Sequence, residues 1–278
     1  MAETLAIENL RFLQERVYAH SGIVLDESKG YLIDARLTPI VRRLQLASIN
    51  DLCALLRAKA RSPLETQVVE AMTTNETYFF REIEQYTAIR EKLIPELLVL
   101  RQTTRHLRFF SAACSTGQEA YSLIMLLLDM GLVGWNLSVL GTDISNPVLD
   151  RARAGRYQQI EVSRGLPSPK LVHYFHHVGA DWELKEDVRR RAEFRLLDLR
   201  EITSKLGLFD AIFCRNVLIY FDAVTRKKIL ARLHACLAPG GWLILGGAEN
   251  CRGTDDLFER LTVGKASVFV AGKPVLAA

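Results

Sequence analysis

The sequence predicts an α/β protein in which a helical domain precedes a Rossmann-like, doubly wound sheet that carries a small inserted β-subdomain. Residues 1 to about 72 place apolar positions at spacings of three and four, as one face of a helix requires. After residue 105, short β-rich runs alternate with helical segments, which is typical of a parallel sheet. The chain has 278 residues, 49% hydrophobic and 24% charged, so it can bury a sizeable core and is not collagenous or disordered.

In the N-terminal part the helices are predicted from their apolar stripes and their caps. The stripes are formed by Leu10, Leu13 and Val17, and by Leu37, Ile40, Val41 and Leu44. A short polar cap followed by proline at the first helical position suits a helix N-terminus. We therefore expect helices to begin at Asn50-Asp51 and at Ser62-Pro63.

In the second part we expect five buried strands, at 107–114, 137–143, 194–199, 209–214 and 242–247. A helix is expected over 222–237, capped by Asp222 and ended by the glycines after Pro239. The insert at about 157–195 fits neither pattern. We expect it to hold a short helix from Ser168 to near His177 and a hairpin within 178–187.

Several classes of protein are disfavoured. The longest apolar run, 123–128, is far shorter than the ~20 residues of a membrane span. The first ten residues lack the basic and apolar pattern of a secretory signal, so we expect a cytoplasmic protein. Five widely spaced cysteines indicate reduced thiols. A net charge of +4 does not by itself indicate nucleic-acid binding.

The segment FFSAACSTGQEAYS (109–122) predicts a strand, a tight loop and a helix, the turn at which doubly wound sheets bind ligands. Gly117 would let a ligand approach the backbone. A dinucleotide fingerprint needs three glycines, so NAD and FAD are disfavoured. Glu119 would repel phosphate and favours a cationic ligand. The alternative is a capping box, Thr116 with Glu119 or Ser115 with Gln118.

Polar residues also end the following strands. Asp143 can accept from both ribose hydroxyls, or it can simply cap the helix after it. Asp198 can accept from an adenine amino group, or it is a turn residue. Arg215 and Asn216 follow the fourth strand. Parallel strands bring these ends to one edge, and the combination indicates S-adenosylmethionine.

Four segments resemble the CheR-type chemoreceptor glutamate O-methyltransferases of bacterial chemotaxis: TTNETYFFRE (73–82), FFSAACSTGQEAYS (109–122), GTDIS (141–145) and FDAIFCRNVLIYFD (209–222). The resemblance covers nearly the whole chain. It implies a receptor-facing helical domain at 1–74, a linker at 75–95 that contributes to the cofactor site, and an S-adenosylmethionine-dependent methyltransferase domain at 96–278 with the β-subdomain inside it.

The resemblance also implies site residues. The cofactor would be bound by Asn75, Thr77, Arg81, Ala112, Gly117, Glu119, Asp143, Asp198, Leu199, Arg215 and Asn216. Arg81 and Tyr220 would act on the substrate. Gln118, Ala120 and Asp198 depart from the family's usual Glu, Pro and Asn, and Asp198 cannot donate to a ring nitrogen. Without the resemblance, 73–82 is an amphipathic segment whose aromatic residues pack between the domains.

The implied partner is the acidic, helical cytoplasmic region of a methyl-accepting chemoreceptor. Between residues 36 and 61 the basic residues Arg36, Arg42, Arg43, Arg57, Lys59 and Arg61 face one acid, Asp51. By resemblance, Arg36, Arg42 and Arg43 contact the receptor; the alternative is a solvated basic face. The insert contains one glycine in HVGADWELKEDVRRR, which favours a form that does not depend on a receptor's C-terminal pentapeptide.

Other functions remain open at this point. The same fold could serve an RNA or small-molecule methyltransferase, or a regulator that binds the cofactor without turnover. We expect no nucleic-acid partner, no membrane insertion and a monomer. The histidines His173, His176 and His177 have helical metal-ligand spacing, but no Cys or Asp joins them, so we expect a solvent-facing helix and no metal site.

Overall fold

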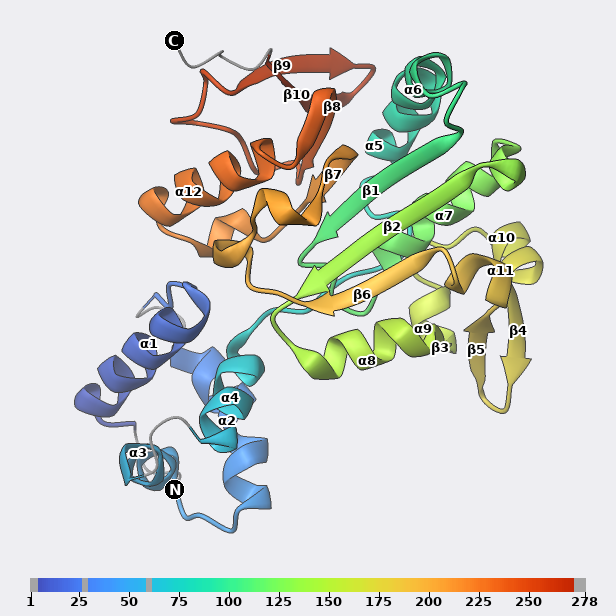
Figure 1. Ribbon diagram of the computed structural model, residues 1–278. Coiled ribbons are helices and arrows are strands. Elements are labelled where there is room, and N and C mark those ends of the chain that lie inside the picture. The colour runs from blue at the N-terminus through green and yellow to red at the C-terminus, as the bar shows by residue number, and fades with distance from the viewer. Residues whose placement is uncertain (1–4, 27–29, 59–61, 273–278) are drawn as a thin grey trace. The chain divides into compact units, whose positions relative to one another are not determined.

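The computed structural model describes residues 5–26, 30–58 and 62–272, and their contacts divide them into two compact units (Figure 1). The first unit consists of the described residues up to Thr74 together with Tyr220–Thr225. The second unit consists of Asn75–Ile219 and the described residues from Arg226 onward. Each unit has its own hydrophobic core.

Four helices make up the first unit: α1 (Ile7–Ser21), α2 (Gly30–Arg43), α3 (Ile49–Ala58) and α4 (Pro63–Met72). Their predicted stripes meet in one core that includes Leu13, Val17, Leu37, Ile40 and Val41. Helix α4 begins at Ser62-Pro63 as predicted. Helix α3 begins earlier than predicted, because Ser48 and Asp51 bond reciprocally: the Asp51 N–H donates to Ser48 Oγ, and the Ser48 N–H donates to Asp51 Oδ2.

The second unit is built on a sheet with the strand order β6-β2-β1-β7-β8-β10-β9. The pairs among β6, β2, β1, β7 and β8 are parallel, as predicted, while β10 is antiparallel to both of its neighbours. The strands span β1 (His106–Ala112), β2 (Asn136–Asp143), β6 (Ala192–Leu196), β7 (Phe209–Cys214), β8 (Leu237–Leu245), β9 (Phe258–Val263) and β10 (Ala266–Ala271).

Helices cover both faces of this sheet. The larger core cluster joins the sheet to α5 (Ile83–Ala88), the π-helical turn Ile89–Leu93, α6 (Ile94–Leu100), α7 (Gln118–Asp129) and α8 (Asn146–Ala154). Figure 1 shows α5 and α12 (Ala223–His234) on opposite sides of β7 and β8. Asp222 caps α12, as predicted, by accepting from the N–H groups of Val224 and Thr225.

The insert forms a three-stranded antiparallel sheet in the order β3-β5-β4. It comprises β3 (Arg156–Gln158), α9 (Gln159–Val162), α10 (Ser168–Tyr174), β4 (Phe175–Val178), β5 (Asp181–Leu184) and α11 (Glu186–Arg189). The predicted hairpin therefore lies a few residues earlier than expected. Of the three histidines only His173 is helical; His176 and His177 lie on β4, so the predicted helical spacing is wrong.

Three further predictions are corrected. The strand expected at 194–199 ends at Leu196, and the helix expected over 222–237 ends at His234, since Leu237 already belongs to β8. Strands β9 and β10 were not predicted. Phe79 and Phe80, for which packing between the domains was the alternative, are buried in the core of the second unit, where the Phe79 ring meets Tyr157 edge-on at 5.0 Å.

None of the helices in the described ranges is long and apolar enough to cross a bilayer. Within the same ranges, no group of three or more His, Cys, Asp or Glu side chains could hold a metal ion.

Candidate active site

Backbone strain marks one place in the second unit. Five of the seven non-glycine residues with positive φ in the described ranges belong to loops at the carboxyl edge of the sheet or to the segment before α5: Phe80, Glu82, Ala113, Ser115 and Asn216. Each such residue costs about 1–3 kcal/mol and persists only where its surroundings hold it. Strain of this kind concentrates at functional sites, which makes these loops candidates for the active site.

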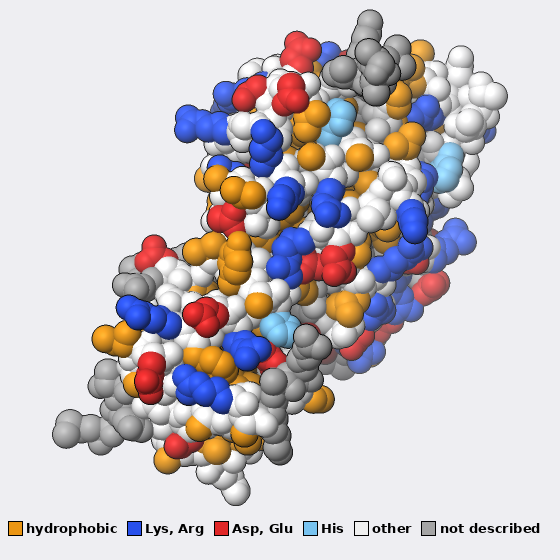
Figure 2. Space-filling view, turned by 60° about the vertical axis from the view of Figure 1, so that its left-hand side comes forward, with side chains coloured by type: hydrophobic (Ala, Val, Ile, Leu, Met, Phe, Trp, Pro, Cys, Tyr) orange, Lys and Arg blue, Asp and Glu red, His pale blue; other side chains and the backbone are white. Residues whose placement is uncertain are grey.

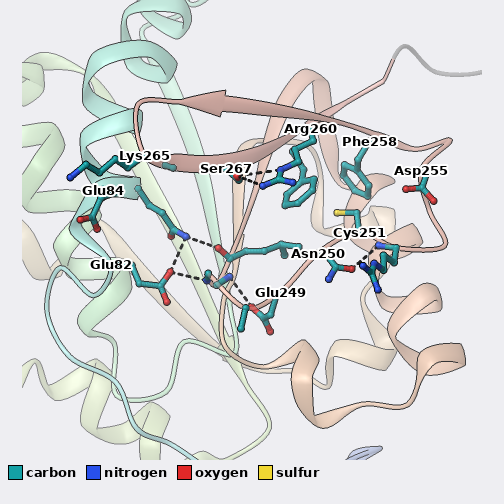
Figure 3. Close-up of a pocket in the computed structure, with 18 residues that line it drawn as sticks. Glu82, Glu84, Glu249, Asn250, Cys251, Asp255, Phe258, Arg260, Lys265 and Ser267 are labelled. Carbon is teal, nitrogen blue, oxygen red and sulfur yellow. Dashed lines mark hydrogen bonds between the residues drawn. The ribbon is translucent and has the colours of Figure 1, made fainter.

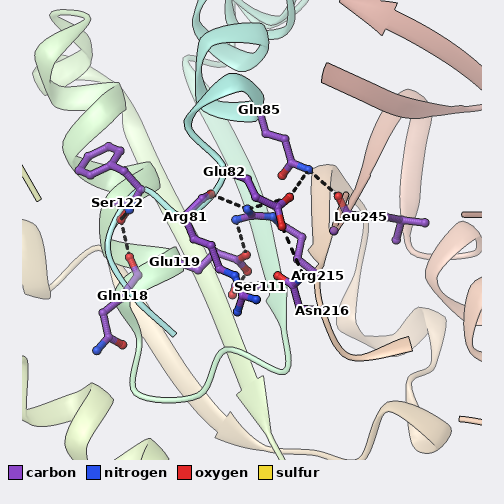
Figure 4. A network of polar contacts seen from close by, with 12 residues as sticks. Arg81, Glu82, Gln85, Ser111, Gln118, Glu119, Ser122, Arg215, Asn216 and Leu245 are labelled. Atoms are coloured by element: carbon purple, nitrogen blue, oxygen red, sulfur yellow. Dashed lines mark hydrogen bonds and ion pairs between the residues drawn. The ribbon is translucent and has the colours of Figure 1, made fainter. Parts of the chain in front are cut away.

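A buried arginine organises the site (Figure 4). Arg215 follows β7, and its side chain is 2% exposed. Its Nη1 lies 3.1 Å from Glu119 Oε2, and its Nη2 lies 3.4 Å from Glu82 Oε2 and donates to the Arg81 carbonyl. Glu119 is held in turn by Ser111 Oγ, which donates to Glu119 Oε1 over 2.6 Å. Glu119 is therefore part of an ion network at the start of α7 rather than of a capping box.

The charge balance of this network keeps Arg215 ionised. Burial by itself lowers the pKa of Arg215, but the carboxylates of Glu119 and Glu82 and the nearby Tyr86 outweigh burial and raise the pKa. Two carboxylates and one guanidinium leave an excess negative charge at the start of α7. Such a place suits a cationic group of a ligand better than a phosphate.

A second group of predicted residues meets at the end of β2. Asp143 Oδ2 accepts from the Ser115 N–H over 2.9 Å, and Asp143 Oδ1 accepts from the Ser145 N–H over 3.1 Å. Ser115 Oγ donates to the Asn75 carbonyl over 2.8 Å. The structure thus brings Asn75 and Asp143 to the same loop. The N-cap of α8 is Ser145 rather than Asp143, and Asp143 bonds to the N–H of that N-cap residue.

Gly117 has a packing reason for its conformation. Its φ is +92°, and an added Cβ would lie 3.0 Å from Ala152 Cβ and 3.2 Å from both the Phe194 and Tyr121 rings. A side chain there would strain the backbone and press on the core. The glycine therefore lets the loop pack against α8 and β6. Ala112, the last residue of β1, is likewise buried.

The carboxylate of Asp198 is bound by Arg200, two residues further along the chain. It lies two residues beyond β6, caps the 3-10 turn Leu199–Glu201 through the Arg200 N–H, and accepts from the Arg200 guanidinium over 2.7 Å. Asp198 is therefore a turn residue, as the alternative prediction had it. Leu199 is buried at 6% exposure. The N–H of Leu197 donates to the Asp143 carbonyl, which places this turn beside the end of β2.

Three further predicted residues, Arg81, Thr77 and Tyr220, are described by their own contacts. The Arg81 guanidinium donates to the Glu76 carbonyl over 3.1 Å and lies 5.6 Å from the centre of the Tyr78 ring. Thr77 is half-buried on the same segment. Tyr220 belongs to the first unit, where its carbonyl accepts from the Val24 N–H, so it is described apart from the residues above.

Glu82 was missed by the sequence analysis. Besides Arg215, it accepts from Gln85 Nε2, from the Gly247 N–H and, over 3.3 Å, from Asn216 Nδ2. It thereby ties the segment before α5 to the loops after β7 and β8. Its place next to Arg81 at the end of TTNETYFFRE is the one signal that could have found it.

The arginines proposed to face a receptor lie in the first unit. Arg42 and Arg43 are exposed at the end of α2, and Arg43 donates to Gln67 Oε1. Arg36 is half-buried and donates to the Met72 carbonyl and to Thr74 Oγ1. Lys59 and Arg61 lie outside the described residues.

The residues gathered at the carboxyl ends of β2 and β7 fit S-adenosylmethionine. The ligand's sulfonium and ammonium groups suit the carboxylates of Glu119 and Glu82. Its carboxylate needs donors, and the buried Arg215 Nε–H has no hydrogen-bond partner among the described residues. Asp143 and Asn75 supply oxygen acceptors at the end of β2.

Comparisons with known proteins also indicate an S-adenosylmethionine-binding domain. Residues 75–266 match the model of the CheR methyltransferase SAM-binding domain, and residues 8–73 match the CheR methyltransferase all-alpha domain. The chain is 37% identical to the chemotaxis protein methyltransferase Cher2 of Pseudomonas putida, over 95% of this chain and 98% of that one. Identity to chemotaxis protein methyltransferase 1 is 37% for Pseudomonas aeruginosa (90% of this chain, 93% of that one) and 38% for Vibrio cholerae (93% and 94%). The chain belongs to the CheR methyltransferase family, and its second unit is an S-adenosylmethionine-binding domain.

Proposed function

We propose that this S-adenosylmethionine-dependent methyltransferase methylates glutamate side chains on the cytoplasmic helical bundle of bacterial chemoreceptors, forming methyl esters. The observation that carries the proposal is that the family match extends over both units, the helical unit as well as the cofactor domain. The relatives are named chemotaxis protein methyltransferases. The exposed Arg42 and Arg43 on the helical unit suit an acidic partner.

A glutamate acceptor suits the chemistry of methyl transfer from this cofactor. S-adenosylmethionine, when bound, supplies a methyl group activated by a positively charged sulfur. A glutamate side chain has a pKa near 4.3, so it is already a nucleophilic anion at neutral pH and needs no general base. The chain's task is to bind, align and exclude water. Alignment alone can supply roughly 7–11 kcal/mol of the barrier.

Loss of water favours this reaction because the opposite charges of acceptor and donor are partly neutralised in the transition state. The buried Arg215 and its carboxylate partners provide fixed charges that are largely shielded from water. The two Nη atoms of Arg215 are paired with Glu119 and Glu82, and we assign its Nε–H, unpartnered among the described residues, to the carboxylate of the cofactor, so Arg215 is not left for the substrate carboxylate.

We assign Arg81 and Tyr220 to positioning the substrate carboxylate. Arg81 spends one guanidinium N–H on the Glu76 carbonyl, which leaves donors for a single or water-mediated contact. A bidentate salt bridge would hold the carboxylate too tightly for attack. Arg81→Ala and Tyr220→Phe should therefore lower turnover at saturating cofactor. Near-normal turnover in both variants would refute the assignment.

The function is tested by incubating the protein with labelled S-adenosylmethionine and receptor cytoplasmic fragments, followed by mass spectrometry of the fragments. We expect glutamates to gain a methyl group that mild base removes. A fragment in which the modified glutamates are replaced by alanine is the control. Base-stable methylation, or methylation of RNA or a small molecule instead, would contradict the proposal. Cofactor binding without any methyl transfer would favour a non-catalytic regulator.

A further inference from the structure

One carboxylate in the second unit holds four backbone N–H groups. Glu249 follows β8, and its Oε2 accepts from the N–H groups of Asn216 at 2.6 Å and Gly246 at 2.8 Å. Its Oε1 accepts from Val217 at 2.9 Å and Leu218 at 2.7 Å. The Glu249 N–H also donates to the Gly246 carbonyl, which closes the turn that carries the carboxylate.

The loop after β7 needs an anion at this point. Three consecutive N–H groups, from Asn216 to Leu218, point at one place, and such an arrangement forms an anion-binding concavity of the backbone. Asn216 also has a φ of +57°, which is costly for a residue with a side chain. Without a charge to accept from them, the converging N–H groups would be left without partners.

Gly246 is shaped for the same contact. An added Cβ there would lie 2.6 Å from Asn216 Nδ2 and 2.8 Å from Glu249 Oε2. These distances are too short for non-bonded atoms, so a side chain at 246 would displace the amide or the carboxylate. The bare backbone of Gly246 therefore allows the loops after β7 and β8 to meet.

We propose that Glu249 is a positioning residue: it acts as the internal anion that holds residues 215–218 so that Arg215 and Asn216 are presented to the cofactor. Glu249 works through the backbone of this loop rather than by touching the cofactor. The proposal rests on the assignment of Arg215 and Asn216 to the cofactor site. It predicts that any carboxylate placed among these N–H groups restores binding.

The structure allows such a carboxylate to enter. Glu249 lines a cavity of about 740 Å³ between the start of α5, the end of β8 and the β9–β10 hairpin (Figure 3). Truncation of its side chain would open the seat of the carboxylate to this cavity. Glu84 lines the same cavity and is exposed, and no hydrogen bond or ion pair to another described residue involves it. It provides a matched control.

The test measures S-adenosylhomocysteine binding by calorimetry. We expect Glu249→Ala to weaken binding about tenfold or more, and added formate to restore a large part of it. Sodium chloride at the same ionic strength should not. Glu249→Gln keeps the shape but offers one acceptor oxygen and an NH2 group, so it should lose binding without rescue. Glu84→Ala should bind as the unaltered protein does.

The outcomes separate the two proposals. Asn216→Ala that binds S-adenosylhomocysteine normally would refute the cofactor-site assignment itself. If Asn216→Ala weakens binding while Glu249→Ala and Glu249→Gln do not, the positioning role is refuted alone. The positioning role would also be refuted if the weakened binding of Glu249→Ala were the same in formate as in sodium chloride of equal ionic strength. Should Glu249→Ala not fold, Gly246→Ala tests the same loop, and normal binding by it would count against the proposal.

Discussion

Arg215 of the second unit differs from Arg42 and Arg43 of the first unit in how far water reaches it. Arg215 in the second unit is 2% exposed and is enclosed by two carboxylates, a carbonyl and an aromatic ring. Arg42 and Arg43 on α2 of the first unit are exposed, and among the described residues the partner of Arg43 is the uncharged amide of Gln67. Figure 2 shows many further basic side chains on the surface, interspersed with acidic ones. The same residue type therefore serves as a fixed internal charge in one unit and as a solvated surface charge in the other.

Removal of the buried arginine should have the largest effect. Arg215→Met leaves Glu119 and Glu82 without their cation, and breaking a buried ion pair in this way costs about 3 kcal/mol or more. Urea denaturation should show that loss in the free energy of unfolding, and S-adenosylhomocysteine binding should fall with it. Arg42→Met is the exposed control. A loss below about 1 kcal/mol would mean that the network is as weak as surface pairs are.

A carboxylate of intermediate exposure should have an intermediate effect. Asp222 caps α12, and hydrogen bonds from the Thr225 N–H and hydroxyl lower its pKa from 3.8 to about 2. Asp222→Ala should cost about 1 kcal/mol of stability at neutral pH, as the loss of an N-cap does.

The pH dependence of this difference has a definite sign. Because the native pKa lies below the unfolded one, the stabilisation by Asp222 is fully present above about pH 4 and disappears as the pH falls through about 2. Denaturation curves of the two proteins should therefore converge in acid. A gap between them that is constant from pH 7 to pH 2 would show that the cap acts without its charge.

Local patterns predicted much of the fold and part of the site. Apolar periodicity located the four helices of the first unit, and strand ends brought Glu119, Asp143, Arg215 and Asn216 to one edge of the sheet. The partners of these residues could not be predicted. Glu249 meets the loop after β7 from 31 to 33 residues away, and Glu82 meets Arg215 and Asn216 across more than half of the second unit's sequence.

The misses have physical reasons of the same kind. Glu82 and Asn216 adopt positive φ angles that only tertiary contacts can hold, so no local propensity indicates them. Asp198 lost its strand-end position because its carboxylate bonds to the Arg200 two residues on and starts a 3-10 turn instead. Strand β9 was missed because its consecutive charged residues, Glu259 and Arg260, are both exposed and do not follow the buried pattern of the inner strands.

The smallest effect on stability should come from charge reversal at the exposed arginines. The same variants test whether these arginines bind the receptor. Arg42→Glu with Arg43→Glu should change the free energy of unfolding by less than about 0.5 kcal/mol, since neither side chain is buried. Methylation of an acidic receptor fragment should nevertheless slow several-fold at low salt, because opposite charges no longer steer the encounter. The rate should also lose most of its dependence on ionic strength, because salt at 0.1 M largely screens exposed charges that are more than about 10 Å apart. Lys227→Glu with Lys228→Glu on the exposed face of α12 is the matched reversal of charge. If both double variants gave the salt profile of the unaltered protein, the basic end of α2 would be a solvated surface, and the receptor would have to be recognised elsewhere.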